Sequence, residues 1–150
     1  MKAVLRLYEA LELRDAERVQ RLFAGDLEWW FHGPPSHQHM KRLLTGEDDD
    51  FHFLIHSVEA FGAATVVAEG TDPTGSVLWV HAWTVADGLI THVREYFNSS
   101  VTITRVASGN ASAASGKSSS ASGDARCFAV WKSRLAGSAG KSLPGLVLAI

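Results

Sequence analysis

Residues 26–40 restrict the fold more strongly than any other segment of this 150-residue chain. They join a short alternating run to Gly33, Pro34 and Pro35, and proline neither continues a strand nor donates a ladder hydrogen bond. A strand over 26–32 must therefore end at this turn. Its apolar face carries Leu27, Trp29 and Phe31, and we expect that face to join a core. The opposite face carries polar groups that need water or a wet pocket, namely Glu28, Trp30 and His32.

Amphipathic helices are predicted on both sides of this strand. Before it, apolar residues follow the i, i+3, i+4, i+7 spacing of one helix face: Val4, Leu7, Tyr8 and Leu11. Asp15 is a suitable N-cap for a second, short helix, and Ser36 is the expected cap of a third helix after the turn.

The following residues are predicted to form an antiparallel meander. Strands are expected over 51–61, 65–71, 76–85 and 89–98, with turns at 72–75 and at Asp87-Gly88. In the first of these strands, we expect one face to carry Phe51, Phe53, Ile55 and Phe61. In the third, one face carries Val77, Trp79, His81, Trp83 and Val85. Helices followed by a long-stranded meander indicate an α+β fold, in which a curved sheet wraps over the helices.

Length and composition indicate a single domain over 1–150. Residues 107–125 are almost entirely Ala, Ser and Gly, and we expect a flexible insert between two strands there. Order is expected to resume at 127–131, and the apolar run in 143–150 indicates a final strand or a buried tail. The formal net charge is -2 without a basic stripe, which argues against a nucleic-acid partner, and no apolar run is long enough to span a membrane. The single cysteine and the absence of a signal peptide favour a cytoplasmic protein, with the nucleus as an alternative location.

Several segments resemble the plant wound-induced and senescence-associated proteins. They are residues 7–11, 22–40, 94–98 and 141–150, and the string Trp-Trp-Phe-His-Gly-Pro-Pro at 29–35 is the most specific. That family is placed in the NTF2-like superfamily, close to the SnoaL-like polyketide cyclases. The resemblance implies a cone, in which a strongly bent antiparallel sheet is closed by three helices around a pocket. It also implies homodimers that pair through their sheets.

The resemblance extends to a possible catalytic site. The ketosteroid-isomerase branch of the superfamily uses a tyrosine of the first helix and two carboxyl groups, and the corresponding positions here are Tyr8, His32 and His81. Histidines at those positions argue against that isomerase but permit acid–base chemistry near neutral pH. The alternative is that these side chains only line a ligand pocket.

Aromatic side chains suggest where a ligand would bind. Trp79 and Trp83 flank His81 on one strand face, which suits a flat, apolar ligand but also suits a core or a dimer interface. Trp30 is a further candidate on the polar face of its strand. Arg94 and Tyr96 share a face with His92, while Glu95 points to the other face, and they either orient a ligand or form a polar ladder outside the pocket.

The spacing of the histidines predicts no metal site. Positions two apart on a helix diverge, which separates His37 from His39, and four residues of strand separate His52 from His56. Residues 47–50 are acidic and are predicted to form a solvated turn. We expect no cofactor.

Three functions remain open at this point. One is a protein that binds a small hydrophobic metabolite in a Trp/His-lined pocket during wound, stress or senescence responses. Another is a cofactor-independent cyclase, isomerase or dehydratase in which His32 and His81 act as acid and base. The third is a non-catalytic scaffold that acts through protein–protein contacts. Fold class alone does not choose between them.

Overall fold

Three helices form where the apolar spacing predicts them. The computed structural model describes residues 1–47, 49–97, 102–105, 129–135 and 147–150. Helix α1 (Lys2–Glu12) buries the predicted apolar stripe, and Asp15 caps α2 (Ala16–Gln20) by accepting a hydrogen bond from the backbone N–H of Arg18 at 3.0 Å.

The helix after the turn begins later than predicted. Strand β1 (Phe23–His32) is followed by one 3₁₀ turn, η1 (Pro35–His37), and then by α3 (His39–Leu44). Ser36 lies inside the 3₁₀ turn, so the prediction that it caps the helix is wrong. Gln38 holds the N-cap position without a side-chain cap hydrogen bond.

The main sheet has five strands in the order β1-β5-β4-β3-β2. Strands β2 (Leu54–Phe61), β3 (Thr65–Thr71), β4 (Leu78–Ala86) and β5 (Leu89–Phe97) form the predicted antiparallel meander. The hairpin between β4 and β5 turns at Asp87 and Gly88, whose φ angles of 52° and 79° suit a type I′ turn. Strand β1 pairs with β5 in parallel, so the sheet is mixed rather than wholly antiparallel. The α+β class is confirmed.

A bulge changes which side chains of β2 face the helices. The register with β3 shifts between Ile55 and Ser57, and one extra residue moves every later side chain to the opposite face. Val58 therefore packs in the core beneath the helices, and Phe61 packs on the other side of the sheet. The predicted common face of Phe51, Phe53, Ile55 and Phe61 is corrected accordingly.

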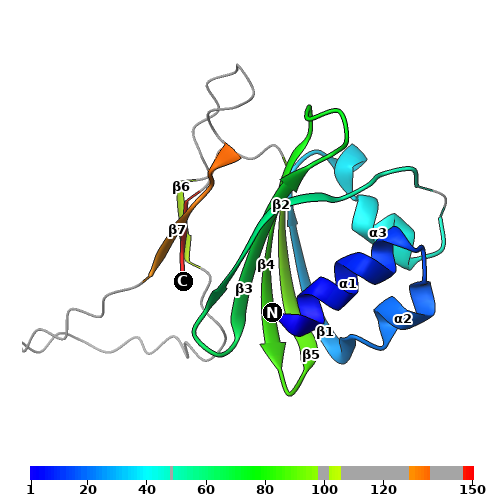
Figure 1. The fold of residues 1–150 in the computed structure, drawn as a ribbon, viewed down its shortest axis with the longest axis horizontal. Helices are drawn as coiled ribbons and strands as arrows, with labels where there is room; N and C mark the ends of the chain where they lie inside the picture. The colour runs from blue at the N-terminus through cyan, green and yellow to red at the C-terminus, as the bar shows by residue number, and fades with distance from the viewer. Residues whose placement is uncertain (48, 98–101, 106–128, 136–146) are drawn as a thin grey trace, which may run out of the picture.

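Each face of the main sheet is covered by a different layer (Figure 1). The three helices lie on one face, which we call the inner face, and together they enclose the larger hydrophobic core. The outer face is covered by a small sheet in which β6 (Thr102–Arg105), β8 (Val147–Ala149) and β7 (Val130–Lys132) lie in that order. Residues 107–125, predicted to be a flexible insert, lie outside the described residues.

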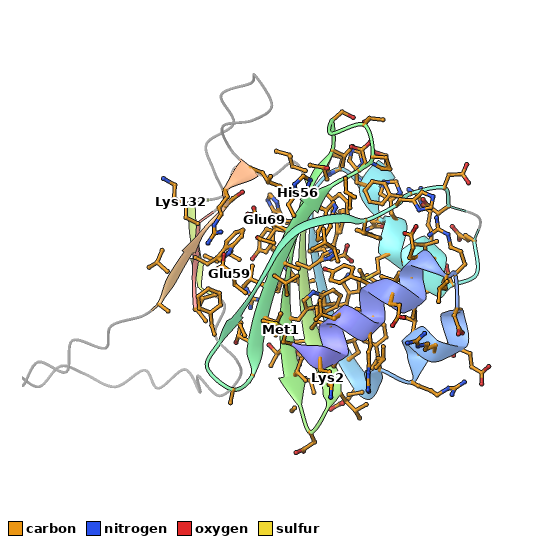
Figure 2. All side chains as sticks on the ribbon, in the orientation of Figure 1. Met1, Lys2, His56, Glu59, Glu69 and Lys132 are labelled. Atoms are coloured by element: carbon orange, nitrogen blue, oxygen red, sulfur yellow. The ribbon has the colours of Figure 1, made fainter. Side chains whose placement is uncertain are left out.

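The outer layer is anchored by apolar and polar contacts. Trp131 and Leu148 pack against Val67, Val80, Ala82 and Tyr96 of the main sheet. Glu69, only 1% exposed, accepts hydrogen bonds from Ser133 Oγ at 2.7 Å and from the backbone N–H of Arg134 at 3.1 Å. Figure 2 shows Glu59 and Glu69 between the main sheet and β7.

This covering layer limits how two copies could pair through their sheets. Much of the outer face of β3, β4 and β5 is buried within the chain itself. The outer face beside β1 is less covered, and Trp30 there is 42% exposed. Among the described residues, no helix is both long and apolar enough to cross a membrane.

Replacing Gly70 with alanine is expected to destabilise the main sheet. A Cβ atom at this position would overlap the carbonyl oxygen of Leu54 and the ring of Trp79, both of which are fixed by packing. We expect Gly70→Ala to lower the free energy of unfolding by about 1–3 kcal/mol or more, measured by urea denaturation. Gly25→Ala is the matched control, since nothing lies within 4 Å of its added Cβ, and it should change stability by less than about 0.5 kcal/mol. Equal effects of the two substitutions would contradict this account of Gly70.

Candidate functional site

The main sheet divides the predicted site residues into two groups. Tyr8, Trp79, His81 and Trp83 lie together on the inner face, where their rings are in mutual contact. The other four lie together on the outer face: Trp30, His32, Arg94 and Tyr96. Because β1 alternates, His32 points away from the helices, and the structure does not bring it together with His81. The predicted His32–His81 acid–base pair is therefore not formed.

The outer group is an aromatic cluster with one cation, in which Trp30 and His32 are exposed, Arg94 is half-buried and Tyr96 is buried. The ring of Trp30 stacks on that of His32 at 5.7 Å between centroids and lies 5.3 Å from that of Tyr96. The guanidinium of Arg94 lies 5.9 Å from the centre of the Trp30 ring, a cation–π distance. This placement agrees with the alternative in which Arg94 and Tyr96 lie outside the pocket.

A chain of hydrogen bonds crosses the inner face from helix to sheet. The Trp83 Nε1–H donates to the Tyr8 hydroxyl oxygen at 3.2 Å, which leaves the Tyr8 O–H free to donate to His81 Nδ1 at 2.6 Å. His81 Nε2 then lies 3.2 Å from Glu95 Oε2 and donates to it. An indole can only donate and a carboxylate can only accept, which fixes the direction of the hydrogen bonds at the two ends of the chain. We call Tyr8, His81, Trp83 and Glu95 the inner network.

The inner network is buried. His81 is 0% exposed and Glu95 is 1% exposed, and a buried polar group without a partner would cost stability. Trp79 and Trp83 are also 0% exposed, with ring centres 4.8 Å and 5.1 Å from that of His81. The structure places the predicted aromatic wall in the core.

The environment of Tyr8 raises its pKa well above the ordinary value of 10.0. Burial is the largest cause, the hydrogen bond from Trp83 opposes it, and the negative charge of Glu95 adds to the increase. Tyr8 is therefore a hydrogen-bond donor at neutral pH and not a base.

The predicted site did not include Glu95. Counting outward from the Asp87-Gly88 turn in a regular hairpin places Arg94 opposite His81. The register shifts between Thr84 and Val85, so that Glu95 becomes the partner of His81. In a regular hairpin, Glu95 would point to the face opposite His81. The bulge that changes this has no clear signature in the sequence.

A cavity of about 240 Å³ lies at the Glu95 end of the inner network. Trp29 and Phe31 of β1 form its apolar wall, and Glu95 is the cross-strand neighbour of Phe31. Gln38 and Lys41, from the N-cap and first turns of α3, complete the lining. An apolar wall with a few convergent polar groups is typical of a small-ligand site.

Other hollows are less suited to a specific ligand. One of about 450 Å³ lies between α1, where Tyr8 lines it, and residues 52–55. Another of about 630 Å³ lies between the helices. The second is the larger, but its polar lining includes exposed groups of both signs, such as Arg14 and Glu47. Both cavities are lined by a residue with a buried carboxylate, but Asp49 in the larger one is already bound by His39, Arg42 and the backbone N–H of Phe51. We favour the smaller cavity because Glu95 there is held by the His81 imidazole only, among the described residues.

A second polar cluster positions the helix that forms the cavity wall. Asp49 Oδ2 lies 2.9 Å from His39 Nδ1 and 3.2 Å from Arg42 Nη1, and Asp49 Oδ1 accepts the backbone N–H of Phe51 at 2.8 Å. The Asp49 side chain is only 5% exposed, so the predicted solvated turn is wrong at this residue. Burial acts to raise the pKa of Asp49, but the His39 and Phe51 hydrogen bonds and the nearby cations outweigh it and lower that pKa.

The two histidines predicted to diverge are in contact. His37 Nδ1 and His39 Nε2 are 3.3 Å apart, because a break in the helix separates the two residues. Burial, followed by the charges of His39 and Arg42, lowers the pKa of His37. Among the residues that the structure describes, no three His, Cys, Asp or Glu side chains form a group that could hold a metal ion.

Solved structures identify the class of fold. An NTF2-like protein of unknown function from Burkholderia pseudomallei is similar with a TM-score of 0.50 and 19% identity, over 65% of this chain and 88% of that one. An LEH-like epoxide hydrolase from M. tuberculosis is similar with a TM-score of 0.51 and 26% identity, over 64% of this chain and 80% of that one. The fold is NTF2-like, as the resemblance implies.

Sequence comparison then identifies the family. The chain belongs to the family of wound-induced protein WI12, whose profile matches residues 40–150. "Senescence associated gene 20" of Arabidopsis thaliana is 49% identical over 113 residues, covering 73% of this chain and 99% of that protein. "Wound-induced protein 1" of Solanum tuberosum is 45% identical over 113 residues, with the same coverage.

Removing the Tyr8 hydroxyl is expected to reduce stability and change its pH dependence. Tyr8→Phe leaves the buried Trp83 N–H without its acceptor, which should cost about 1–3 kcal/mol at pH 7. Between the unfolded tyrosine pKa near 10.0 and the higher folded pKa of Tyr8, folded protein keeps a proton that unfolded protein has lost. The contribution of protonated Tyr8 to the free energy of unfolding is thus fully present below pH 10. It falls above pH 10, by at most about 1.4 kcal/mol per pH unit.

Urea unfolding between pH 8 and about 11 measures this difference. The wild type should lose more stability above pH 10 than Tyr8→Phe does, because every other titrating group is common to both proteins. Parallel pH profiles would show that Tyr8 is not the buried, protonated group described above.

Proposed function

We propose that this protein binds a small, largely apolar ligand in the cavity lined by Trp29, Phe31, Gln38, Lys41 and Glu95. The observation that supports it best is Glu95, a lining residue of the cavity that is 1% exposed and whose carboxylate is held by His81 at 3.2 Å. Burying a carboxylate is unfavourable unless hydrogen bonds satisfy it. His81 accounts for one of several acceptor sites on Glu95, and a donor group of a ligand would use another.

The proposal moves the ligand site from the residues first predicted. Trp83 and His81 support the cavity through the inner network instead of lining it, and Trp79 packs against His81 in the core. The apolar wall comes from the inner face of β1, next to the predicted Trp30 and His32 but on the other side of the strand. Glu95 takes the place of a predicted histidine as the polar group that the ligand meets.

Affinity capture of small molecules tests this function directly. Wild-type protein would be incubated with extract of wounded Solanum tuberosum leaf, washed, and its bound molecules identified by mass spectrometry. We expect Glu95→Gln to retain at least about tenfold less of the captured compound, because a charge-assisted hydrogen bond is lost. Gln38→Trp should reduce capture by filling the cavity.

Glu69→Gln provides a matched control for this experiment. Glu69 is also 1% exposed, but it lies beneath the outer layer and lines none of the cavities described above. The Glu69→Gln variant should therefore capture as much ligand as the wild type. Equal capture by wild type, Glu95→Gln and Gln38→Trp would refute the cavity as the binding site.

Acid–base catalysis at Glu95 is a second candidate function. The observation that favours it is the hydrogen-bond chain from Trp83 through Tyr8 and His81, which orients the carboxylate that lines the cavity. A carboxylate held in this way can accept a proton next to a ligand carbonyl, as a cyclase, isomerase or dehydratase requires. The similarity to an LEH-like epoxide hydrolase supports an enzyme on this fold by analogy only.

The same extract distinguishes the two functions. A binder leaves the captured compound chemically unchanged. An enzyme consumes it and forms a product of different mass or chromatographic retention, and Glu95→Gln should form none of that product while Glu69→Gln forms as much as the wild type.

A further inference from the structure

We infer that the cavity takes a small carboxylic acid built on one apolar ring with a hydroxyl group at the far end. The inference rests on the proposed binding function and names the class of ligand for the same site. Three properties of the cavity support it: its volume, the burial of Glu95, and the position of Lys41 in the lining.

The volume limits the ligand to about one ring. Pockets for drug-sized ligands are roughly 300–1,000 Å³, whereas a benzene-sized ligand fits a cavity of about 150 Å³. The cavity beside Glu95 is about 240 Å³ and therefore suits a single ring with short substituents. The aromatic residues Trp29 and Phe31 in the lining suit an aromatic or flat apolar ring.

The buried end of the cavity selects a neutral donor. Glu95 is 1% exposed, so a ligand group that reaches it loses its water. A hydroxyl group loses much less hydration free energy than an ammonium group does, and it donates a charge-assisted hydrogen bond to the carboxylate in compensation. A second carboxylate at this end would be repelled.

The open end of the cavity selects an anion. Lys41 is exposed and lines the cavity, and no ion pair between described residues includes it. Its neighbour Arg42 is instead bound to Asp49. A ligand carboxylate beside Lys41 would remain partly hydrated, so it gains attraction without the cost of complete burial.

Four commercial compounds separate these features. The reference is 4-hydroxyphenylacetate, which carries both groups at opposite ends of one ring. Phenylacetate lacks the hydroxyl, methyl 4-hydroxyphenylacetate lacks the charge, and tyramine replaces the carboxylate with an amine. Calorimetric titration of full-length protein gives the affinity of each. We expect 4-hydroxyphenylacetate to bind most tightly and tyramine most weakly.

Variants assign each preference to a side chain. Lys41→Met should lower the affinity for 4-hydroxyphenylacetate by about two- to fivefold and leave the affinity for the methyl ester unchanged. It should also abolish the dependence of 4-hydroxyphenylacetate binding on salt concentration. Glu95→Gln should lower the affinity for 4-hydroxyphenylacetate by about tenfold or more. The affinities for 4-hydroxyphenylacetate and for phenylacetate, which lacks the hydroxyl, should then differ less than they do in the wild type. Lys132→Met and Glu69→Gln are the matched controls and should behave as the wild type.

The outcomes separate this inference from the proposed function. If the ester or tyramine binds as tightly as the acid, or if Lys41→Met weakens all four compounds equally, the ligand class is wrong while the cavity remains the binding site. If none of the four compounds binds to the wild type, the ligand class is also wrong. Whether the cavity binds any ligand is then tested by comparing how much compound the wild type, Glu95→Gln and Gln38→Trp each capture from leaf extract.

Discussion

The hydrogen bonds that join Tyr8, His81 and Glu95 constrain the whole arrangement of helix and sheet. The three side chains come from α1, β4 and β5, and all lie within the core. A buried phenol, imidazole or carboxylate is costly when it has no partner. Small shifts of α1 along the sheet would break the 2.6 Å contact between Tyr8 and His81, so the polar network selects one position for a helix that apolar packing alone would hold less specifically.

The two buried glutamates show how the main sheet separates two tasks. Glu95 on the inner face is held by one imidazole and lines a cavity. Glu69 on the outer face is held by Ser57, Ser133 and the backbone N–H of Arg134. These contacts satisfy Glu69 within the chain, and it anchors the covering layer. The contact with His81 leaves Glu95 further acceptor capacity, and this difference is why we assign ligand binding to the inner face.

Much of this architecture could be predicted from the sequence, since periodicity and turn chemistry act locally. The apolar stripe of α1, the Asp15 cap, the Asp87-Gly88 turn and the inward face of β4 all follow from short-range rules. The predicted common face of β2 is wrong because one extra residue near His56 shifts the register, and an extra residue near Thr91 in β5 likewise changes the partner of His81 from the one that a regular hairpin would give. The contact of His37 with His39 was missed for a related reason, because a break in the helix changes the direction of side chains two residues apart.

The bulge in β5 determines the charge of the candidate site. With a regular hairpin, Arg94 would face His81 on the inner side and Glu95 would face outward. A buried guanidinium there would have no carboxylate to pair with, and the cavity would be lined by two cations, Arg94 and Lys41. The observed register instead places Glu95 beside His81 and leaves Arg94 over the Trp30 ring on the outer face. The extra residue in β5 thus gives the cavity an acceptor at its buried end and a cation at its open end, and this polarity defines which ligands it can hold.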